Sequence, residues 1–216
     1  MALIELTTHT AIPGRLDSFL QVFAEELRPA ASAAGARLLL LATGASGPLN
    51  EAVAGWWHDS AVAQAQAQDR LQDDAGWQAA RRRAGELLLR EHTQLVRTST
   101  FTGVTPASAG VRLVDLRTYS FHPEGLQAFL PICEADGLPH QRRHCGELLF
   151  HGVSASGRLH QLVQAWGYRD HAQYEVGQRN LFADAEWARG YRQRVIHLVQ
   201  EQEHRHLRVL PGSPAA

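Results

Sequence analysis

The segment Val111 to Phe121 carries an aspartate, an arginine and a tyrosine at every second position. Alternate side chains of an extended strand point to the same face, so Asp115, Arg117 and Tyr119 are expected to lie side by side. Burying either charge alone is costly, so a buried aspartate and arginine must pair. The pattern allows two interpretations. It is either a structural ion pair or an anchor for an anionic or carbonyl-bearing ligand, with the Tyr119 hydroxyl as a further donor.

A second run with alternating character, Leu159 to Tyr168, mixes aromatic and polar side chains on one face. Repeated tryptophans are typical of a core, but tryptophan, tyrosine, glutamine and histidine together also line small-molecule pockets. A ligand site is therefore predicted against these strands. The candidate ligand-binding residues are Arg117, Tyr119, Trp56, His160, Gln164, Trp166 and Tyr168, and the candidate acid/base groups are His9, His58 and Asp115.

Histidines are numerous, with 12 in the chain, and they raise the question of a metal or a haem. His140 and His144 stand four residues apart, as two ligands on one helix would, but no acidic residue follows closely enough to supply a third ligand. No metal site is therefore predicted. A haem would need one accessible histidine at a pocket wall, for which His9, His58 and His160 are candidates. No tightly bound cofactor is expected, and haem stays as a lesser alternative.

The basic residues exclude several kinds of chemistry, because all 21 of them are arginine. Without lysine the chain can form neither a Walker A phosphate loop nor a pyridoxal Schiff base. The net charge of -1 indicates no nucleic-acid partner, and no apolar stretch is long enough for membrane insertion. Cys133 and Cys145 lack metal or redox spacing and are interpreted as free thiols, which together with the absence of a leader predicts a cytoplasmic location.

The elements that must position these residues occur twice. An offset of 110 residues aligns the two halves of the chain without a gap, placing Trp56 on Trp166 and the Asp-Ala-x-Trp motif ending at Trp77 on the one ending at Trp187. We therefore predict a duplication. Its predicted parts are a first copy at 1–101, a linker at 102–110 that is rich in small residues, a second copy at 111–211 and a loose tail at 212–216.

The element order is clearest in the second copy. Pattern and turn signals predict a strand at Val111–Phe121, a helix at Glu124–His144 interrupted at Pro131 and Pro139, and a hairpin of Glu147–Val153 and Leu159–Tyr168. They then predict a helix capped by Asp170, a second capped by Asp184 that continues to about Glu203, and a last strand at His206–Leu210.

The order βαββαβ is typical of an α+β, ferredoxin-like unit with both helices on one face of a four-stranded sheet. The opposite face of each sheet needs a cover, and two units in one chain can cover each other. The predicted fold is therefore an intramolecular dimeric α/β barrel made of two tandem units. This closure permits a monomer and leaves a homodimer open.

The second copy resembles the NIPSNAP family in four successive stretches: LRTYSFHPEGLQAFL, GLPHQRRHCGELLF, GRLHQLVQAWGYRD and NLFADAEWARGYRQRV. The resemblance covers about Val111 to Pro211 and implies the same barrel fold. The first copy matches through its similarity to the second, with Thr7, His9 and His58 in place of Arg117, Tyr119 and Tyr168. The wider superfamily contains cofactor-independent monooxygenases and haem-binding enzymes, an analogy of fold alone.

Three functional hypotheses follow. The first is a barrel that binds a small, partly apolar metabolite and transforms it without a tightly bound cofactor. The second is a non-enzymatic interaction or scaffold protein, and the third is a haem-dependent enzyme. A solvent-connected cavity beside Trp166 favours the first, a packed interior the second, and a Soret absorption band the third.

Overall fold

Eight strands form the centre of the molecule in a computed structural model that describes residues 1–99, 103–106, 108–211 and 213. Each copy contributes four of the strands, in the order β-α-β-β-α-β. The first copy provides β1 (Leu3–Ala11), β2 (Arg37–Gly44), β3 (Glu51–His58) and β4 (Leu88–Thr98). The second provides β5 (Leu113–Phe121), β6 (Glu147–Ser154), β7 (Gln161–Tyr168) and β8 (Val199–Val209).

The helices of each copy form two successive runs that lie on one side of its sheet. The first copy has the continuous run α1 (Leu16–Val22), η1 (Phe23–Leu27) and α2 (Arg28–Ala33), followed later by α3 (Ala61–Asp73) and α4 (Ala75–Gly85). The second has α5 (Pro123–Ile132), η2 (Cys133–Gly137), α6 (Leu138–His144), α7 (His171–Ala183), η3 (Glu186–Tyr191), α8 (Arg192–Val195) and η4 (Ile196–Leu198). The segments η1, η2 and η3 are π-helical, and η4 is a 3₁₀ turn.

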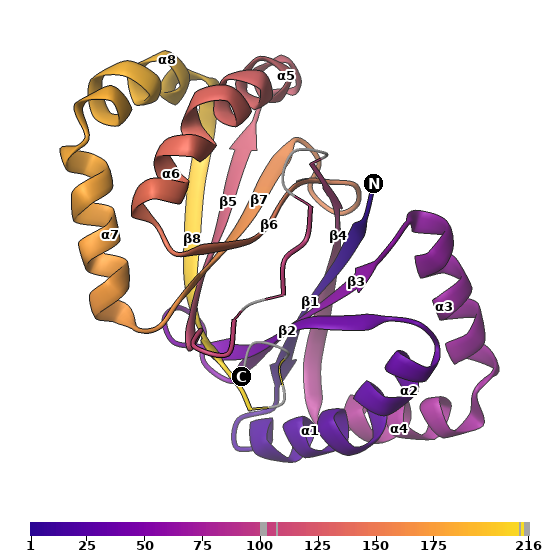
Figure 1. The fold of residues 1–216 in the computed structure, drawn as a ribbon. Coiled ribbons are helices and arrows are strands. Elements are labelled where there is room, and N and C mark those ends of the chain that lie inside the picture. The colour runs from indigo at the N-terminus through magenta and orange to yellow at the C-terminus, as the bar shows by residue number, and fades with distance from the viewer. Residues whose placement is uncertain (100–102, 107, 212, 214–216) are drawn as a thin grey trace.

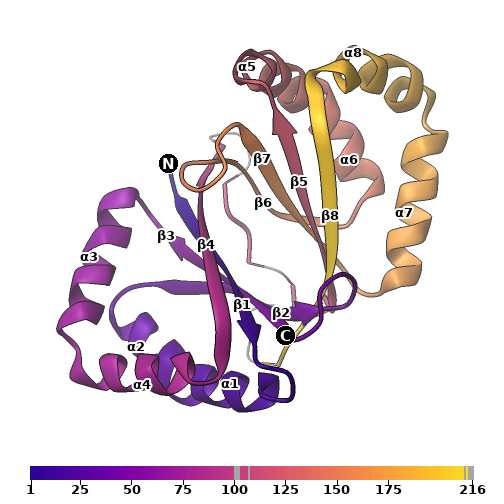
Figure 2. The ribbon, with the colours of Figure 1, turned by 180° about the vertical axis from the view of Figure 1, so that it is seen from behind.

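The strands close into a barrel in the order β1-β3-β2-β8-β5-β7-β6-β4, which confirms the predicted fold. Every pairing is antiparallel, and the two copies join where β2 meets β8 and where β4 meets β6. The middle of the barrel interior is apolar and takes side chains from both sheets, among them Ile4, Val53, Val114 and Val163, all fully buried. The helices of the two copies lie outside, at opposite ends of the molecule (Figures 1 and 2). None of the helices in the described ranges combines the length and apolar character that crossing a membrane would need.

The last strand of the second copy begins earlier than predicted. The helical prediction to about Glu203 is wrong, because β8 starts at Val199 and pairs with β5 along its length. Its other edge meets β2 only at Ala42–Gly44, so most of its first half is exposed and its sequence is correspondingly polar. An exposed polar edge strand lacks the alternation that marks a half-buried one, which explains the error.

The gapless alignment of the two copies also fails at this strand. Thr7 lies opposite Thr93 in the first copy, whereas Arg117 lies opposite His204 in the second, so the last strands correspond at an offset of 111 residues. The extra residue falls after Trp187, where the second copy forms the π-helical segment η3 and the first copy has the regular helix α4. A π-helix takes one residue more into each hydrogen-bonded ring than an α-helix, and such bulges are frequent at functional sites.

The predicted linker and tail both lie against the barrel where they are described. Residues 100–102 and 107 fall outside the described part, but Val104 pairs with Phe150, and the Thr105 amide donates to the carbonyl of Leu149 at 2.9 Å. In the tail, 212 and 214–216 lie outside it as well. Ser213 is buried, and its hydroxyl accepts a hydrogen bond from the Leu41 amide at 3.2 Å.

We predict that Gly152→Ala destabilises the protein by about 1–3 kcal/mol, because β4 and β6 approach too closely there for a methyl group. A Cβ at Gly152 would lie 2.4 Å from the carbonyl oxygen of Arg97. Gly85→Ala is the control, since a Cβ there meets nothing within 4 Å. Urea denaturation measures both variants. Equal stability of the two would show that the barrel seam is not tightly packed at this point.

Candidate functional site

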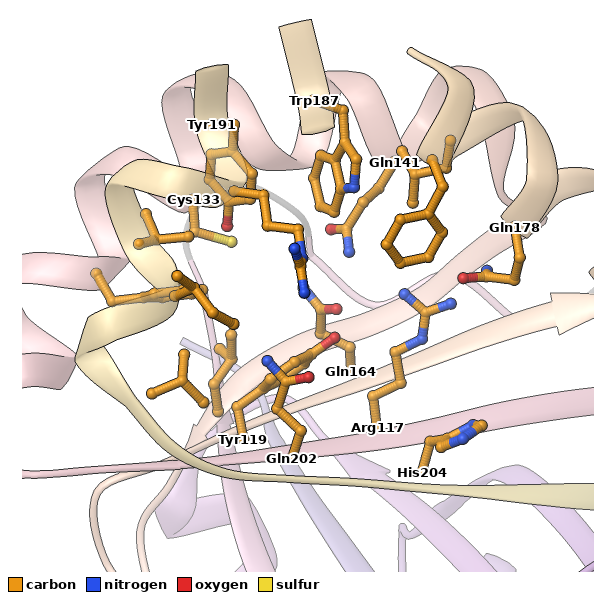
Figure 3. A pocket seen from close by; sticks show the side chains of 18 of the residues that line it. Arg117, Tyr119, Cys133, Gln141, Gln164, Gln178, Trp187, Tyr191, Gln202 and His204 are labelled. Atoms are coloured by element: carbon orange, nitrogen blue, oxygen red, sulfur yellow. The ribbon is translucent and has the colours of Figure 1, made fainter. Parts of the chain in front are cut away.

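A cavity of about 290 Å³ lies between the sheet and the helices of the second copy. Strand residues Arg117, Tyr119 and Gln164 line it from one side. Cys133, Gln141, Trp187 and Tyr191 face them from η2, α6 and η3 (Figure 3). Exposed Phe182 and Ile196 are also among the lining residues, so the cavity is open to solvent on that side.

The π-helical segments bring the helix side chains to this cavity. Cys133 begins η2, while Trp187 and Tyr191 lie in η3, where their rings stack with centroids 4.7 Å apart. Gly137 makes this packing possible, because a Cβ there would lie 2.5 Å from the Tyr191 ring. Burial raises the pKa of the Cys133 thiol to about 12, so the thiol remains protonated at neutral pH.

A buried ion pair forms the floor of the site. Arg117 donates from Nε to Asp115 Oδ2 at 2.7 Å, with Asp115 fully buried and Arg117 only 7% exposed. Burial lowers the pKa of Arg117, but Tyr119 and Asp115 outweigh that effect and hold it well above its usual value. The far end of the guanidinium faces the cavity (Figure 3). The geometry therefore accommodates both interpretations of the pair, since one edge of Arg117 holds Asp115 and the other faces the cavity.

Two buried polar atoms of cavity-lining residues have no hydrogen-bond partner among the described residues. They are Oε1 of Gln141, an acceptor, and Nε1 of Trp187, a donor. Leaving such an atom unpaired costs about 1–3 kcal/mol, so a bound ligand or water is the expected partner. Sequence reasoning missed both residues. Trp187 had a signal in its repeated Asp-Ala-x-Trp motif, whereas nothing in the sequence distinguished Gln141.

Comparison with known sequences agrees with this architecture. The sequence model of the NIPSNAP family matches residues 4–102 and 114–214, which together span most of the chain. The chain belongs to the NIPSNAP family. The match includes the first copy, which sequence reasoning related to the family only through its similarity to the second. No curated protein matches the chain.

Solved structures of similar fold cover nearly the whole of this NIPSNAP chain. A candidate monooxygenase of Fusobacterium nucleatum has a TM-score of 0.69 at 10% identity, covering 97% of this chain and 92% of its own. One from Lactobacillus acidophilus has a TM-score of 0.68 at 6% identity, covering 96% and 93%. An anthrone oxidase-like protein has a TM-score of 0.64 at 12% identity, covering 97% and 91%. At these identities the likeness is one of fold.

The remaining predicted ligand residues of the second copy lie around the cavity rather than in its lining. Trp166 is fully buried, and its indole donates to Gln164 Oε1 at 3.3 Å, so it holds a lining residue in place. Tyr168 is also buried, and burial raises the pKa of its phenol. His160 was expected on the strand face, but β7 begins one residue later and His160 occupies the turn with a φ of 57°.

Trp56, His9 and His58 belong to the first copy and lie on the helix-facing side of its own sheet. At the position that Cys133 holds in the second copy, the first has Phe23, whose ring packs 5.9 Å from Trp56. The His9 ring is tilted against that of Phe19, with centroids 4.8 Å apart. His9, Phe19 and Phe23 stand at the positions of three residues that line the cavity of the second copy, Tyr119, Phe129 and Cys133. Neither His9 nor His58 lines the cavity of the second copy, and their acid/base roles stay predictions.

A polar network completes the packing of the first copy. Glu91 accepts hydrogen bonds from Arg81 at 2.8 Å and from His9 Nδ1 at 2.7 Å. Burial raises the pKa of Glu91, but the bonds from Arg81 and His9 outweigh it and lower the pKa to about 2. His58 is buried at the other end of β3, where neither ring nitrogen has a hydrogen-bond partner in the described structure and Nε2 lies 3.8 Å from Glu5 Oε2. Burial lowers the pKa of His58.

The prediction that no acidic residue lies near His140 and His144 is wrong. Asp184 lies close to both histidines. Asp184 Oδ2 is 2.9 Å from His140 Nδ1 and 3.1 Å from His144 Nε2. The sequence did not indicate this proximity, because Asp184 follows His144 by 40 residues and begins the next helical segment. Its other oxygen accepts the amides of Glu186 and Trp187, so the carboxylate is fully used as a helix cap.

We predict that Glu91→Gln flattens the acid dependence of stability. The folded pKa of about 2 lies below the ordinary value of 4.5, so the carboxylate stabilises the fold above pH 4.5. That contribution disappears as the pH falls from 4.5 towards 2. Urea denaturation across this range should give a steeper loss for the native protein than for the variant. Glu175→Gln, an exposed site on α7, serves as control, and equal slopes for all three proteins would contradict the prediction.

Proposed function

We propose that the second copy binds a small, partly apolar carboxylate or carbonyl compound in its cavity and that the first copy does not. The supporting observation is the arrangement of polar groups in a cavity whose lining is otherwise largely apolar. The guanidinium of Arg117 faces the cavity, and the buried, unpaired Trp187 Nε1 and Gln141 Oε1 belong to side chains that line it. A few convergent polar groups within apolar walls are typical of a small-molecule site.

Charge favours an anionic or electron-rich ligand. The chain already neutralises one edge of Arg117 through Asp115, so the cavity receives a guanidinium held rigidly in place. Arg192 lines the same cavity at its exposed side, where exposed Glu203 also lines it and offsets that charge, so the buried guanidinium of Arg117 carries the argument. Burial raises the pKa of Tyr119, although Arg117 opposes the rise, so the phenol is protonated and able to donate. A carboxylate would therefore meet donors on several sides.

The cavity suits a compound with one or two rings. At about 290 Å³ it lies at the small end of the range for ligand pockets. Its apolar wall comes from Phe129, Leu162, Leu181 and Val195, which would enclose a ring or short aliphatic chain. Of the solved structures with a similar fold, two are described as candidate monooxygenases and one as anthrone oxidase-like. Anthrone is a polycyclic aromatic compound.

Any transformation in this cavity would rest on stabilising negative charge rather than on a thiolate. Cys133 stays protonated because burial raises its pKa to about 12. Protonated Tyr119, Arg117 and the Trp187 N–H are donors, and such donors stabilise an enolate or phenolate oxygen as charge develops. This is the role we propose for them, without a tightly bound cofactor.

We predict that Trp187→Phe weakens binding of a small aromatic carboxylate about 3- to 10-fold, because it removes one hydrogen-bond donor and keeps an aromatic ring. A thermal-shift screen of aromatic acids, their amides and aldehydes would supply the probe, and calorimetry would measure affinity. The acid should bind more tightly than its amide.

Trp77→Phe is the matched control, because Trp77 is the equivalent tryptophan of the first copy. It should leave the affinity unchanged. Failure of every compound to bind would favour the scaffold hypothesis, and a Soret band on addition of haem would favour the haem hypothesis. Equal loss of affinity in both tryptophan variants would place the site elsewhere.

A further inference from the structure

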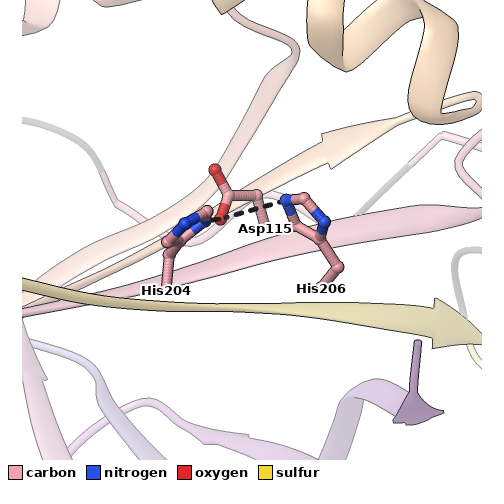
Figure 4. Close-up of side chains that lie close together, drawn as sticks. All are labelled: Asp115, His204 and His206. Carbon is pink, nitrogen blue, oxygen red and sulfur yellow. Dashed lines mark ion pairs between the residues drawn. The ribbon is translucent and has the colours of Figure 1, made fainter. Parts of the chain in front are cut away.

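One oxygen of the buried Asp115 carboxylate has no hydrogen-bond partner within the described structure. Oδ2 accepts from Arg117, but Oδ1 is unpaired although the residue is fully buried. Two histidines of β8 approach this free oxygen (Figure 4). His204 Nδ1 lies 3.4 Å away and His206 Nε2 lies 3.9 Å away, and this nitrogen of His206 is also buried and unpaired.

These separations are long for direct hydrogen bonds but suit atoms that share one ion. A good N–H···O bond spans about 2.7–3.2 Å. Ligand atoms at about 2.0–2.2 Å from a tetrahedral zinc ion lie roughly 3.4 Å from one another. The distance from Asp115 to His204 already matches, and the distance from Asp115 to His206 needs a shift of about half an ångström to do so.

We propose that Asp115 Oδ1, His204 Nδ1 and His206 Nε2 form a binding site for a divalent transition-metal ion of the zinc class. Two imidazole nitrogens and one carboxylate oxygen are the donors such ions prefer, and three protein ligands leave a fourth position open. His204 lines the cavity described above, so the open position would lie at the edge of that cavity.

The sheet holds the three ligands in place. In the pairing of β5 with β8, Asp115 lies opposite His206 and Arg117 lies opposite His204. The His206 ring packs 4.4 Å from Tyr174 and 5.2 Å from His171, which fixes its orientation. Arg117 fixes the carboxylate from its other side, as outer-shell partners of metal ligands do.

The first copy lacks these ligands. At the corresponding positions Glu5 lies opposite Leu95, and Thr7 lies opposite Thr93. Glu5 accepts a hydrogen bond from Gln64 at 3.0 Å. The unpaired carboxylate with two histidines is therefore a feature of the second copy. The metal-site proposal rests on the contacts of Asp115 with His204 and His206, not on the proposed small-molecule ligand. Either the metal site or the small-molecule site can therefore be disproved without the other.

The cluster of His140, Asp184 and Glu186 is the competing location for an ion. There the hydrogen bonds of Asp184 to His140 and to two backbone amides are already formed at normal distances. Nothing at that cluster requires a further partner, so we assign the ion to Asp115 and the two histidines of β8.

The test uses full-length protein freed of metal by chelation and titrated with Zn²⁺ in competition with a chromophoric chelator. We predict that one equivalent binds and that His204→Ala lowers the affinity at least about 10-fold. His204 is exposed, so this variant should fold, and circular dichroism checks that it does. His206→Gln should behave likewise, and Co²⁺ should give visible absorption bands in the native protein that both variants lose.

His92→Ala is the matched control, since His92 is an exposed histidine on β4, the equivalent strand of the first copy. It should bind Zn²⁺ as the native protein does. Absence of Zn²⁺ binding in the native protein would overturn the proposal. So would unchanged binding in His204→Ala and His206→Gln, or a loss of binding confined to His144→Ala.

Discussion

The structure depends on the need of each four-stranded sheet to cover its second apolar face. Helices cover one face within each copy, and the other face is buried only by the sheet of the other copy. Each fully buried side chain such as Ile4 or Val114 contributes about 1.5–3 kcal/mol, and a handful of them equals the whole stability of a typical domain. The middle of the interior is consequently apolar, whereas polar side chains such as Glu51 and Gln161 lie buried and hydrogen-bonded near its ends.

Within that constraint the two copies have diverged in one region. The strand pairings place His9 opposite Glu91 in the first copy and Tyr119 opposite Gln202 in the second. In the first copy the carboxylate binds His9 and Arg81, and aromatic rings fill the surrounding space. In the second, the π-helical segment η3 turns an aromatic pair toward a cavity that keeps unpaired polar atoms. The two copies thus differ, and the cavity to which we assign a ligand belongs to the second.

The sequence was sufficient for the fold and for the strand side of the site. Period-two alternation placed Arg117, Tyr119 and Gln164 on one face, and those three line the cavity. The helix side could not be predicted, because Trp187 reaches the cavity through a π-helix that no periodicity marks. The proposed metal ligands on β8 could not be found for a related reason: the exposed polar start of this strand was predicted as helix, and only pairing with β5 brings His206 to Asp115.

Hydrogen-exchange mass spectrometry with and without a bound aromatic carboxylate tests the central claim most directly, because it reports on both copies in one experiment. We expect protection at η2, at η3 and along β5, and none at η1 or α4, which are the equivalent segments of the first copy. Protection at η1 and α4, or only at the seams where β2 meets β8 and β4 meets β6, would contradict the account.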